Sequence, residues 1–360
     1  SINYHPGGIM KRYFFTILLS LLLCGTLTAA DEDKLIFAAK TGNLKVVQQY
    51  IEENYSPDTA DKSGKTIIMH AVSAGKYNVA EYLLSKGASA NRSDNKGYSA
   101  MHILASNSSK ASLAFMEKAL SSKARTGDIA FDGETPAAIL IRKGNIAGIE
   151  LFLDKGDFTP HTNVRGVPAI VYAYKFGQKK IFMLLADRGA NLNVNDDKRT
   201  PLLFLAVEKR DLATVKYIVE KGAVVDIKNP GGETPLLAAA KNGDLSITLY
   251  LAEKGASQSV SDISGRNVLH MLASVRNAGK IIQAFKFDSS VINKRDKSGM
   301  TPIYYAASLK RWENVIPIAE TGGDINFADT AGKTLLMAVI EGGNLETAGY
   351  IIKKGGSVKA

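Results

Sequence analysis

Short apolar segments recur in pairs along the chain, and each segment closes on glycine. Within residues 229–261, apolar residues at helical spacing occupy 235–242 before Gly243 and 245–254 before Gly255. A helix ends readily on glycine, because glycine adopts a positive φ without strain at Cβ. The pattern therefore predicts two short helices joined by a tight loop.

This pair of segments returns about every 33 residues. The glycine that closes the second segment recurs at Gly156, Gly189, Gly222 and Gly255, and we expect it to hold a positive φ. A glycine in the turn between pairs recurs at Gly64, Gly97, Gly133, Gly166, Gly232, Gly265, Gly299 and Gly332. A fixed period of this length indicates stacked repeats, because one helix pair cannot bury its apolar faces alone.

A Thr-Pro pair precedes the first segment in several units. Threonine is a good N-cap, and proline suits the first helical position because its missing N–H would be unpaired there. We expect these caps at Thr135, Thr200, Thr234 and Thr301. The units at 94–129 and 262–295 are longer than the period and lack the second glycine, so we expect different helices or loops there.

These residues together resemble the ankyrin repeat. The stretches 232–240, 221–223 and 188–193 are similar to its pattern, and about ten units stand in register between residues 33 and 360. The resemblance implies an all-α ankyrin-repeat solenoid of about ten stacked helix-turn-helix units with short β-turn tips. It also implies binding of a protein rather than catalysis.

The N-terminal part of the chain has a different character. Residues 1–9 precede Met10 and are interpreted as an upstream extension without native structure. Residues 10–30 combine Lys11 and Arg12, an apolar run and small residues before Asp31, which is typical of a signal peptide. The run of 15 apolar residues is shorter than the ~20 that a spanning helix needs, so we expect cleavage and no membrane span afterwards.

The remaining chain, 31–360, is interpreted as one repeat domain. It comprises an N-terminal capping unit at 31–60, further units over 61–328 and a C-terminal unit at 329–360. Export into a bacterial periplasm is expected, with secretion or a lipid anchor at Cys24 as alternatives. Cys24 is the single cysteine, so the cleaved chain offers no disulfide framework. We expect a monomer.

Candidate catalytic chemistry is sparse. No HExxH, paired-cysteine, glycine-rich phosphate or GxSxG motif appears, so we predict no catalytic residue, no metal site and no cofactor. His102 and His270 stand at the histidine position of the family pattern. The resemblance implies that their side chains tie the turn to the helix by hydrogen bonds.

Basic and aromatic residues gather at particular positions of the repeat. The resemblance implies a concave face built from turn tips and first-helix ends. Turn tips contribute Lys62, Arg165, Arg199 and Arg266 among others, and the candidate partner-binding residues are Lys65, Lys96, Tyr98, Arg142, Lys143, Lys175, Phe176, Lys209 and Lys241. One interpretation is a groove for an acidic protein, with Phe176 and Tyr98 as anchors. The other is that these are ordinary solvated lysines and arginines.

The balance of charge bears on the kind of partner. Lys and Arg number 45 against 35 Asp and Glu, a net charge of +10. Nucleic acid would also suit a basic groove, but the secretory signal argues against it. The leading hypothesis is a non-enzymatic exported scaffold that binds a protein through its concave face. The alternatives are a secreted effector or toxin-associated binding factor, and an enzyme with an unrecognised site.

Overall fold

A computed structural model describes residues 29–357 of the chain. These residues form 21 helices and two strands of two residues each, which confirms the all-α solenoid class predicted from the repeat. Residues 1–9, Cys24 and most of the predicted signal peptide at 10–30 lie outside the described residues. The first described helix begins at Ala29.

The helices fall into two compact units. Unit 1 comprises residues up to 165 together with 176–181, and unit 2 comprises 166–175 and the residues from 182 onward. The elements of unit 1 are α2 (Ala29–Thr41), α3 (Leu44–Glu52), α4 (Ile67–Ser73), α5 (Tyr77–Ser85), α6 (Ala100–Ser106), α7 (Lys110–Ser121), α8 (Pro136–Lys143), α9 (Ile146–Lys155) and β1 (Asn163–Val164).

Unit 2 repeats the same helix pairs. Its elements are β2 (Val167–Pro168), α10 (Ala169–Lys175), α12 (Leu202–Glu208), α13 (Leu212–Glu220), α14 (Pro235–Lys241), α15 (Leu245–Glu253), α16 (Val268–Ser274), α17 (Gly279–Ala284), α18 (Ser289–Ile292), α19 (Pro302–Ser308), α20 (Trp312–Glu320), α21 (Leu335–Glu341) and α22 (Leu345–Lys353). Helix α11 (Lys179–Asp187) has residues in both units.

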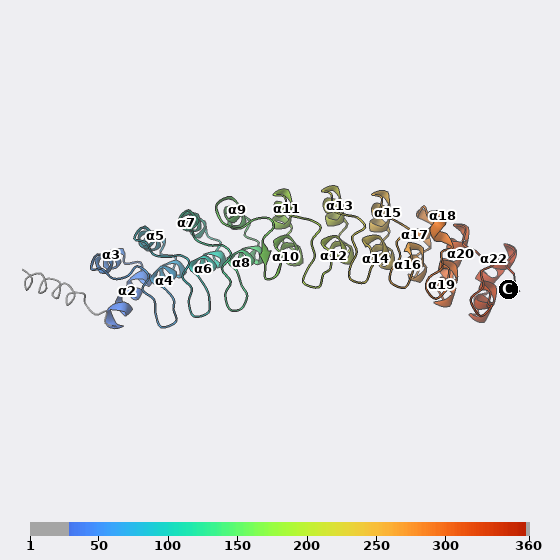
Figure 1. Cartoon of the computed structure of the whole chain (residues 1–360), viewed down its shortest axis with the longest axis horizontal. Helices are drawn as coiled ribbons and strands as arrows, with labels where there is room; N and C mark the ends of the chain where they lie inside the picture. Colours follow the sequence, from blue (N-terminus) through green and yellow to red (C-terminus); the bar gives the residue numbers. More distant parts are fainter. Residues whose placement is uncertain (1–28, 358–360) are drawn as a thin grey trace, which may run out of the picture. The chain divides into compact units, whose positions relative to one another are not determined.

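Within each unit the helices stand in two rows. In unit 1 the inner helices α4, α6 and α8 form one row and the outer helices α5, α7 and α9 form the other, with the connecting loops on the far side of the inner row (Figure 1). In unit 2 the inner helices α12, α14 and α16 and the outer helices α13 and α15 repeat this arrangement (Figure 1). The inner helices are almost wholly buried, since small residues such as Ala239 and Ala240 allow close approach of their neighbours.

We call the loop between one outer helix and the next inner helix a finger. An Asp or Asn side chain in most fingers accepts hydrogen bonds from backbone N–H groups two or four residues later: Asp61, Asp94, Asp196, Asn229, Asp262, Asp296 and Asp329. Such side-chain acceptors satisfy the backbone N–H groups of the turn, as strand pairing would in a sheet. The fingers are therefore ordered turns that place the side chains they carry.

The positive φ predicted for the glycines that close the outer helices is confirmed at Gly222 and Gly255 but is wrong at Gly156. Gly222 and Gly255 adopt φ of 91° and 84° after α13 and α15, as expected. Gly156 instead has an extended backbone with φ −96°. An added Cβ at Gly156 would stand 2.7 Å from Thr126 Cγ2 and 2.8 Å from the Phe152 carbonyl oxygen, so this glycine allows close packing rather than a left-handed turn.

The predicted threonine caps require a correction as well. Thr135 and Thr234 accept hydrogen bonds from Ala138 N–H and Leu237 N–H. Thr301 occupies the cap position of α19 without a side-chain hydrogen bond. Thr200 is not a cap, because α12 begins one residue later and Pro201 is its N-cap. The preceding Arg199, rather than a glycine, takes the positive φ of that turn.

The two longer units differ from the rest in their outer helices. Helix α7 has 12 residues where α5 has 9, and Lys123 with φ 63° stands where other units have glycine. In the second long unit the outer helix is divided into the six-residue α17 and the four-residue α18. The extra residues therefore lengthen or break outer helices and leave α6 and α16 at seven residues.

Candidate partner-binding surface

A buried glutamate holds two arginines in unit 1. Glu134 lies in a finger directly before the cap Thr135. Arg142 Nη1, near the end of α8, is 2.6 Å from Glu134 Oε1. Arg165 Nη1, in the following finger, contacts the same oxygen. Glu134 Oε2 is buried and has no hydrogen-bond partner among the described residues.

Tyr98 is fixed beside this cluster. Its hydroxyl donates to Asp132 Oδ2 at 2.5 Å, which links two neighbouring fingers of unit 1. Its ring packs edge-on against His102 with centroids 5.2 Å apart. The hydrogen bond to Asp132, with burial adding to it, raises the pKa of Tyr98 to about 12. Tyr98 therefore stays neutral and has little rotational freedom.

In unit 2, the cation at the end of α10 is held by two carboxylates. Lys175 Nζ, at the end of α10, lies 3.2 Å from Asp196 Oδ2 and 2.6 Å from Asp197 Oδ1 of the next finger. The hydrogen bond to Asp197 raises the pKa of Lys175, although partial burial opposes it. Lys175 is therefore charged and held in place.

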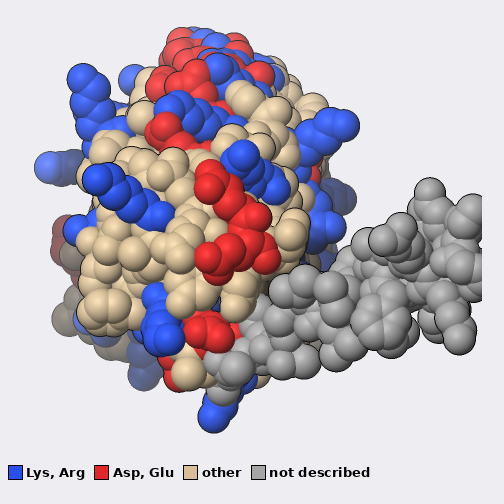
Figure 2. All heavy atoms as spheres, turned by 90° about the vertical axis from the view of Figure 1, so that its left-hand side faces the viewer, with Lys and Arg blue, Asp and Glu red and all other residues tan. Residues whose placement is uncertain are grey.

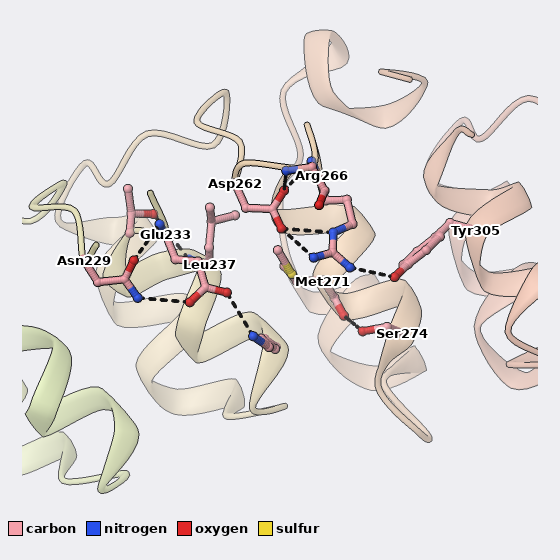
Figure 3. Close-up of polar contacts among 11 residues, drawn as sticks. Asn229, Glu233, Leu237, Asp262, Arg266, Met271, Ser274 and Tyr305 are labelled. Carbon is pink, nitrogen blue, oxygen red and sulfur yellow. Dashed lines mark hydrogen bonds and ion pairs between the residues drawn. The ribbon is translucent and has the colours of Figure 1, made fainter. Parts of the chain in front are cut away.

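A second finger of unit 2 uses a glutamate in the same way as Glu134. Asn229 Nδ2 donates to Glu233 Oε2 at 3.1 Å, and Figure 3 shows both side chains above α14. Glu233 Oε1 in turn accepts from Lys241 Nζ at 2.9 Å. The spacing of eight residues between Glu233 and Lys241 equals that between Glu134 and Arg142.

Arg266 joins two neighbouring repeats within unit 2. Its Nε and Nη2 donate to Asp262 Oδ2 at 3.0 and 2.7 Å, and its Nη1 donates to Tyr305 Oη of α19 at 3.0 Å (Figure 3). Burial by itself would raise the pKa of Asp262, but the hydrogen bonds from Arg266 and Ser264 together with the charge of Arg266 outweigh it, so the pKa is lowered. Both groups therefore stay charged near neutral pH.

The other predicted residues are less constrained. Lys96, Lys143 and Lys209 are exposed, Lys65 is half-buried, and no ion pair is described for these four within residues 29–357. Lys209 Nζ lies 4.6 Å from the centre of the Tyr174 ring, a cation–π contact. Phe176 follows α10 and is 47% exposed.

The two histidines lie beneath the fingers. His102 Nδ1 pairs with Ser99 at 3.0 Å, and its Nε2 lies 3.3 Å from the Glu134 carbonyl oxygen of the next finger. His270 makes the equivalent contacts with Asn267 and with the Met300 carbonyl oxygen at 3.1 Å. Burial lowers the pKa of both histidines. Each ring thus connects its own helix cap to the adjacent finger.

Burial separates the two signs of charge in four of these pairs, whereas Asp197, the second carboxylate of Lys175, keeps 58% of its side-chain exposure. The carboxylates of Glu134, Asp196 and Asp262 keep 7%, 3% and 3% of their side-chain exposure. Their cations keep between 31% and 42%: Arg142, Arg165, Lys175 and Arg266. A partner therefore meets the cation first, while the carboxylate below fixes the cation's position and reduces its field.

Sequence reasoning identified the cations and missed the acidic residues that hold them. Three of the predicted cations, Arg142, Lys175 and Lys241, are paired with the carboxylates of Glu134, Asp196 and Glu233, which the sequence-based prediction did not include. The repeated Glu-Thr pairs, eight residues before Arg142 and Lys241, were the available signal. Seen from the end that holds α2 and α3, the surface likewise carries acidic and basic groups side by side (Figure 2).

Metal-ligating side chains do not cluster among the described residues. No group of three or more His, Cys, Asp or Glu within residues 29–357 could hold a metal ion. A hollow of about 530 Å³ lies between α5 and α7 and is lined in part by Glu81, Leu84 and Lys118. Lys118 Nζ lies 2.6 Å from Glu81 Oε1, so these two groups are paired with each other.

Comparison with known proteins identifies the class to which this architecture belongs. Residues 35–118, 138–229, 170–262 and 203–315 match the family model of ankyrin repeats in three copies, and together these segments cover more than half of the chain. The chain therefore belongs to the ankyrin repeat family. Ankyrin repeats are typically non-enzymatic interaction modules, which supports a protein–protein interaction scaffold.

Two curated relatives agree with this assignment. An ankyrin repeat protein of fowlpox virus (strain NVSL), FPV230, is 26% identical over 189 residues, which is 48% of this chain and 92% of that protein. The RelA-associated inhibitor of Mus musculus is 35% identical over 72 residues, which is 20% of this chain and only 9% of that protein. Among the described residues, no helix has the length and apolar character that a membrane span requires.

Proposed function

We propose that the chain binds an acidic segment of a protein partner through its fingers and inner-helix ends. The observation that carries this proposal is the layering of charge, with cations outside and their carboxylates buried beneath. A cation held in place loses less side-chain entropy on binding than a mobile one. The proposed residues are Lys65, Lys96, Tyr98, Arg142, Lys143 and Phe176 on unit 1, and Lys175, Lys209 and Lys241 on unit 2.

The relatives support the general role. One of them is named as an inhibitor associated with another protein, which is consistent with a family that acts by binding. The acidic character of the partner is inferred from this chain's own cations. Positive side chains on one surface accelerate encounter with a negative partner, and added salt weakens that effect.

The experiment uses cations that hold no buried carboxylate. Reversing Arg142 or Lys175 would leave Glu134 or Asp196 buried beside like charge and would destabilise the fold. The test variant is therefore Lys96→Glu, Lys143→Glu and Lys209→Glu in one chain. Its matched control changes Lys86, Lys254 and Lys354 to Glu, which are exposed at outer-helix ends and alter the net charge equally.

Association with a dye-labelled octaglutamate peptide is measured by stopped flow at several salt concentrations. We expect the test variant to associate roughly tenfold more slowly at low salt and to lose most of its salt dependence, because steering charges act on the on-rate. The control should keep most of the wild-type rate. Equal losses in both variants, or no binding by the wild type, would contradict the proposed surface.

We also propose that the chain is exported and trimmed before Asp31, on the pattern of residues 10–30. In that case the partner is met in a periplasm or outside the cell. N-terminal sequencing of the protein from its native cell should begin close to Asp31. An intact Met10 in the cytoplasmic fraction would overturn this proposal.

A further inference from the structure

Two guanidinium groups converge on one carboxylate oxygen in unit 1. Arg142 Nη1 lies 2.6 Å from Glu134 Oε1, and Arg165 Nη1 contacts the same oxygen from the next finger. Glu134 is buried while the two arginine side chains keep 42% and 40% exposure. The carboxylate therefore holds the two guanidinium groups next to each other, and both arginine side chains remain partly exposed. Lys175 shows the opposite ratio, with one cation between two carboxylates.

The backbone at Arg165 indicates that this side chain is retained at a cost. Arg165 has φ 51° and Gly166 has φ 81°, so both central residues of the turn are left-handed. Asparagine or glycine fits the first of these positions with less strain than arginine does. Strained positions of this kind are common where a side chain must be held in place for binding. The shared contact with Glu134 then holds the guanidinium group of Arg165 next to that of Arg142 before any partner arrives.

Resting on the proposed function, we propose that Arg142 and Arg165 together form the receptor for one carboxylate group of the acidic partner segment. A guanidinium group carries five N–H donors in a plane, so it can bind Glu134 and a further carboxylate at once. Two adjacent guanidinium groups can donate to both oxygens of that carboxylate. Such a contact fixes the register of the partner, which diffuse attraction to lysines cannot do.

The charges around the pair favour a carboxylate over a phosphate. Arg142 and Arg165 are balanced by Glu134 and by Asp132, which lies in the same finger as Glu134 and accepts from Tyr98. A doubly charged phosphate would therefore place more negative charge beside these two carboxylates than a singly charged carboxylate does. Tyr98 supplies a fixed aromatic ring on the adjacent finger, against which the methylene groups of a glutamate side chain can pack.

The test separates this receptor from general attraction by charge. In the full chain, Arg142→Lys and Arg165→Lys are combined, because lysine keeps the charge and loses the planar, forked donors. The matched control is Arg125→Lys, an arginine of unit 1 that pairs with Asp128 at 2.8 Å and is 58% exposed. Association and dissociation of the dye-labelled octaglutamate peptide are measured by stopped flow, and thermal melting verifies that each variant is folded.

We expect the double variant to release the peptide roughly tenfold faster at an unchanged association rate, and the control to match the wild type. A double variant with wild-type dissociation would overturn the receptor while leaving the proposed function intact. Absence of octaglutamate binding by the wild-type chain would instead overturn both. Inorganic phosphate should displace the peptide no better than acetate at equal ionic strength, and stronger displacement by phosphate would overturn the choice of a carboxylate.

Discussion

At the scale of single residues, backbone conformation decides which side chains each repeat can carry. Gly222 and Gly255 end outer helices at positive φ, and an added Cβ at either would meet no atom within 4 Å. Lys123 holds the equivalent position in the unit at 94–129 with φ 63°. The cost of a side chain at these positions therefore comes from the backbone and not from crowding.

This comparison leads to a prediction about stability. Gly222→Val and Gly255→Val should each lower the free energy of unfolding by about 1–2 kcal/mol, because a β-branched residue is strained at positive φ. Lys241→Ala, which removes an ion pair with Glu233 whose lysine side chain is 54% exposed, should cost less than about 1 kcal/mol. Lys123→Gly should be neutral or stabilising. Urea unfolding measures all four, and equal losses for the valine variants and Lys241→Ala would contradict the assignment of these helix ends.

At the scale of elements, the inner helices depend on how their first turn is capped. Thr66, Thr135, Thr234 and Thr334 accept a hydrogen bond from the N–H group three residues later. Thr301 occupies the same position of α19, yet its buried hydroxyl has no hydrogen-bond partner among the described residues. Two helices that are similar in sequence are therefore stabilised differently at their N-termini.

The two threonines can be compared directly by substitution. Thr234→Val removes the cap of α14 without changing the shape of the side chain, and should cost about 1 kcal/mol. Thr301→Val removes a hydroxyl that has no partner, and should be neutral or slightly stabilising. Midpoints of urea unfolding provide the measurement. A loss at Thr301 as large as that at Thr234 would show that the Thr301 hydroxyl is hydrogen-bonded in solution.

At the scale of the whole molecule, buried polar groups repeat from unit to unit. His70, His102 and His270 lie in the first turns of the inner helices α4, α6 and α16, and burial lowers the pKa of all three below the ordinary value of 6.5. His70 Nε2 also contacts Asp61 Oδ2 at 2.8 Å. Burial alone would raise the pKa of Asp61, but hydrogen bonds from Ser63, His70 and the backbone lower it to about 2.

These shifts predict how stability depends on pH. Below pH 6.5 the unfolded chain takes up protons at the histidines more readily than the folded chain does, so the free energy of unfolding should fall as the pH is lowered through this value. A second loss should follow between about pH 3.8 and 2, as Asp61 is protonated in the unfolded chain first. Urea unfolding from pH 8 to 5 measures the first loss. His102→Asn should reduce that slope.

Much of the architecture was predictable from the sequence, because a helix end and a stacking period are local properties. Glycine at positive φ and threonine at a cap act on their own turn of the chain, so the pattern around Gly222, Gly255, Thr135 and Thr234 predicted the helices correctly. The number of stacked units follows from the period for the same reason. The cations of the candidate surface were also recognisable, since they recur at fixed positions of the unit.

Only the tertiary structure decided which charges meet. Arg165 reaches Glu134 from 31 residues away, and Lys175 reaches Asp196 from 21 residues away. Such pairs depend on how one finger lies against the next element, which no local rule specifies. The same holds for Gly156, whose glycine serves contact with Thr126 rather than a left-handed turn, and for Thr200, which lies one residue outside the cap. The repeat is encoded locally, whereas the character of its surface arises from contacts between successive repeats.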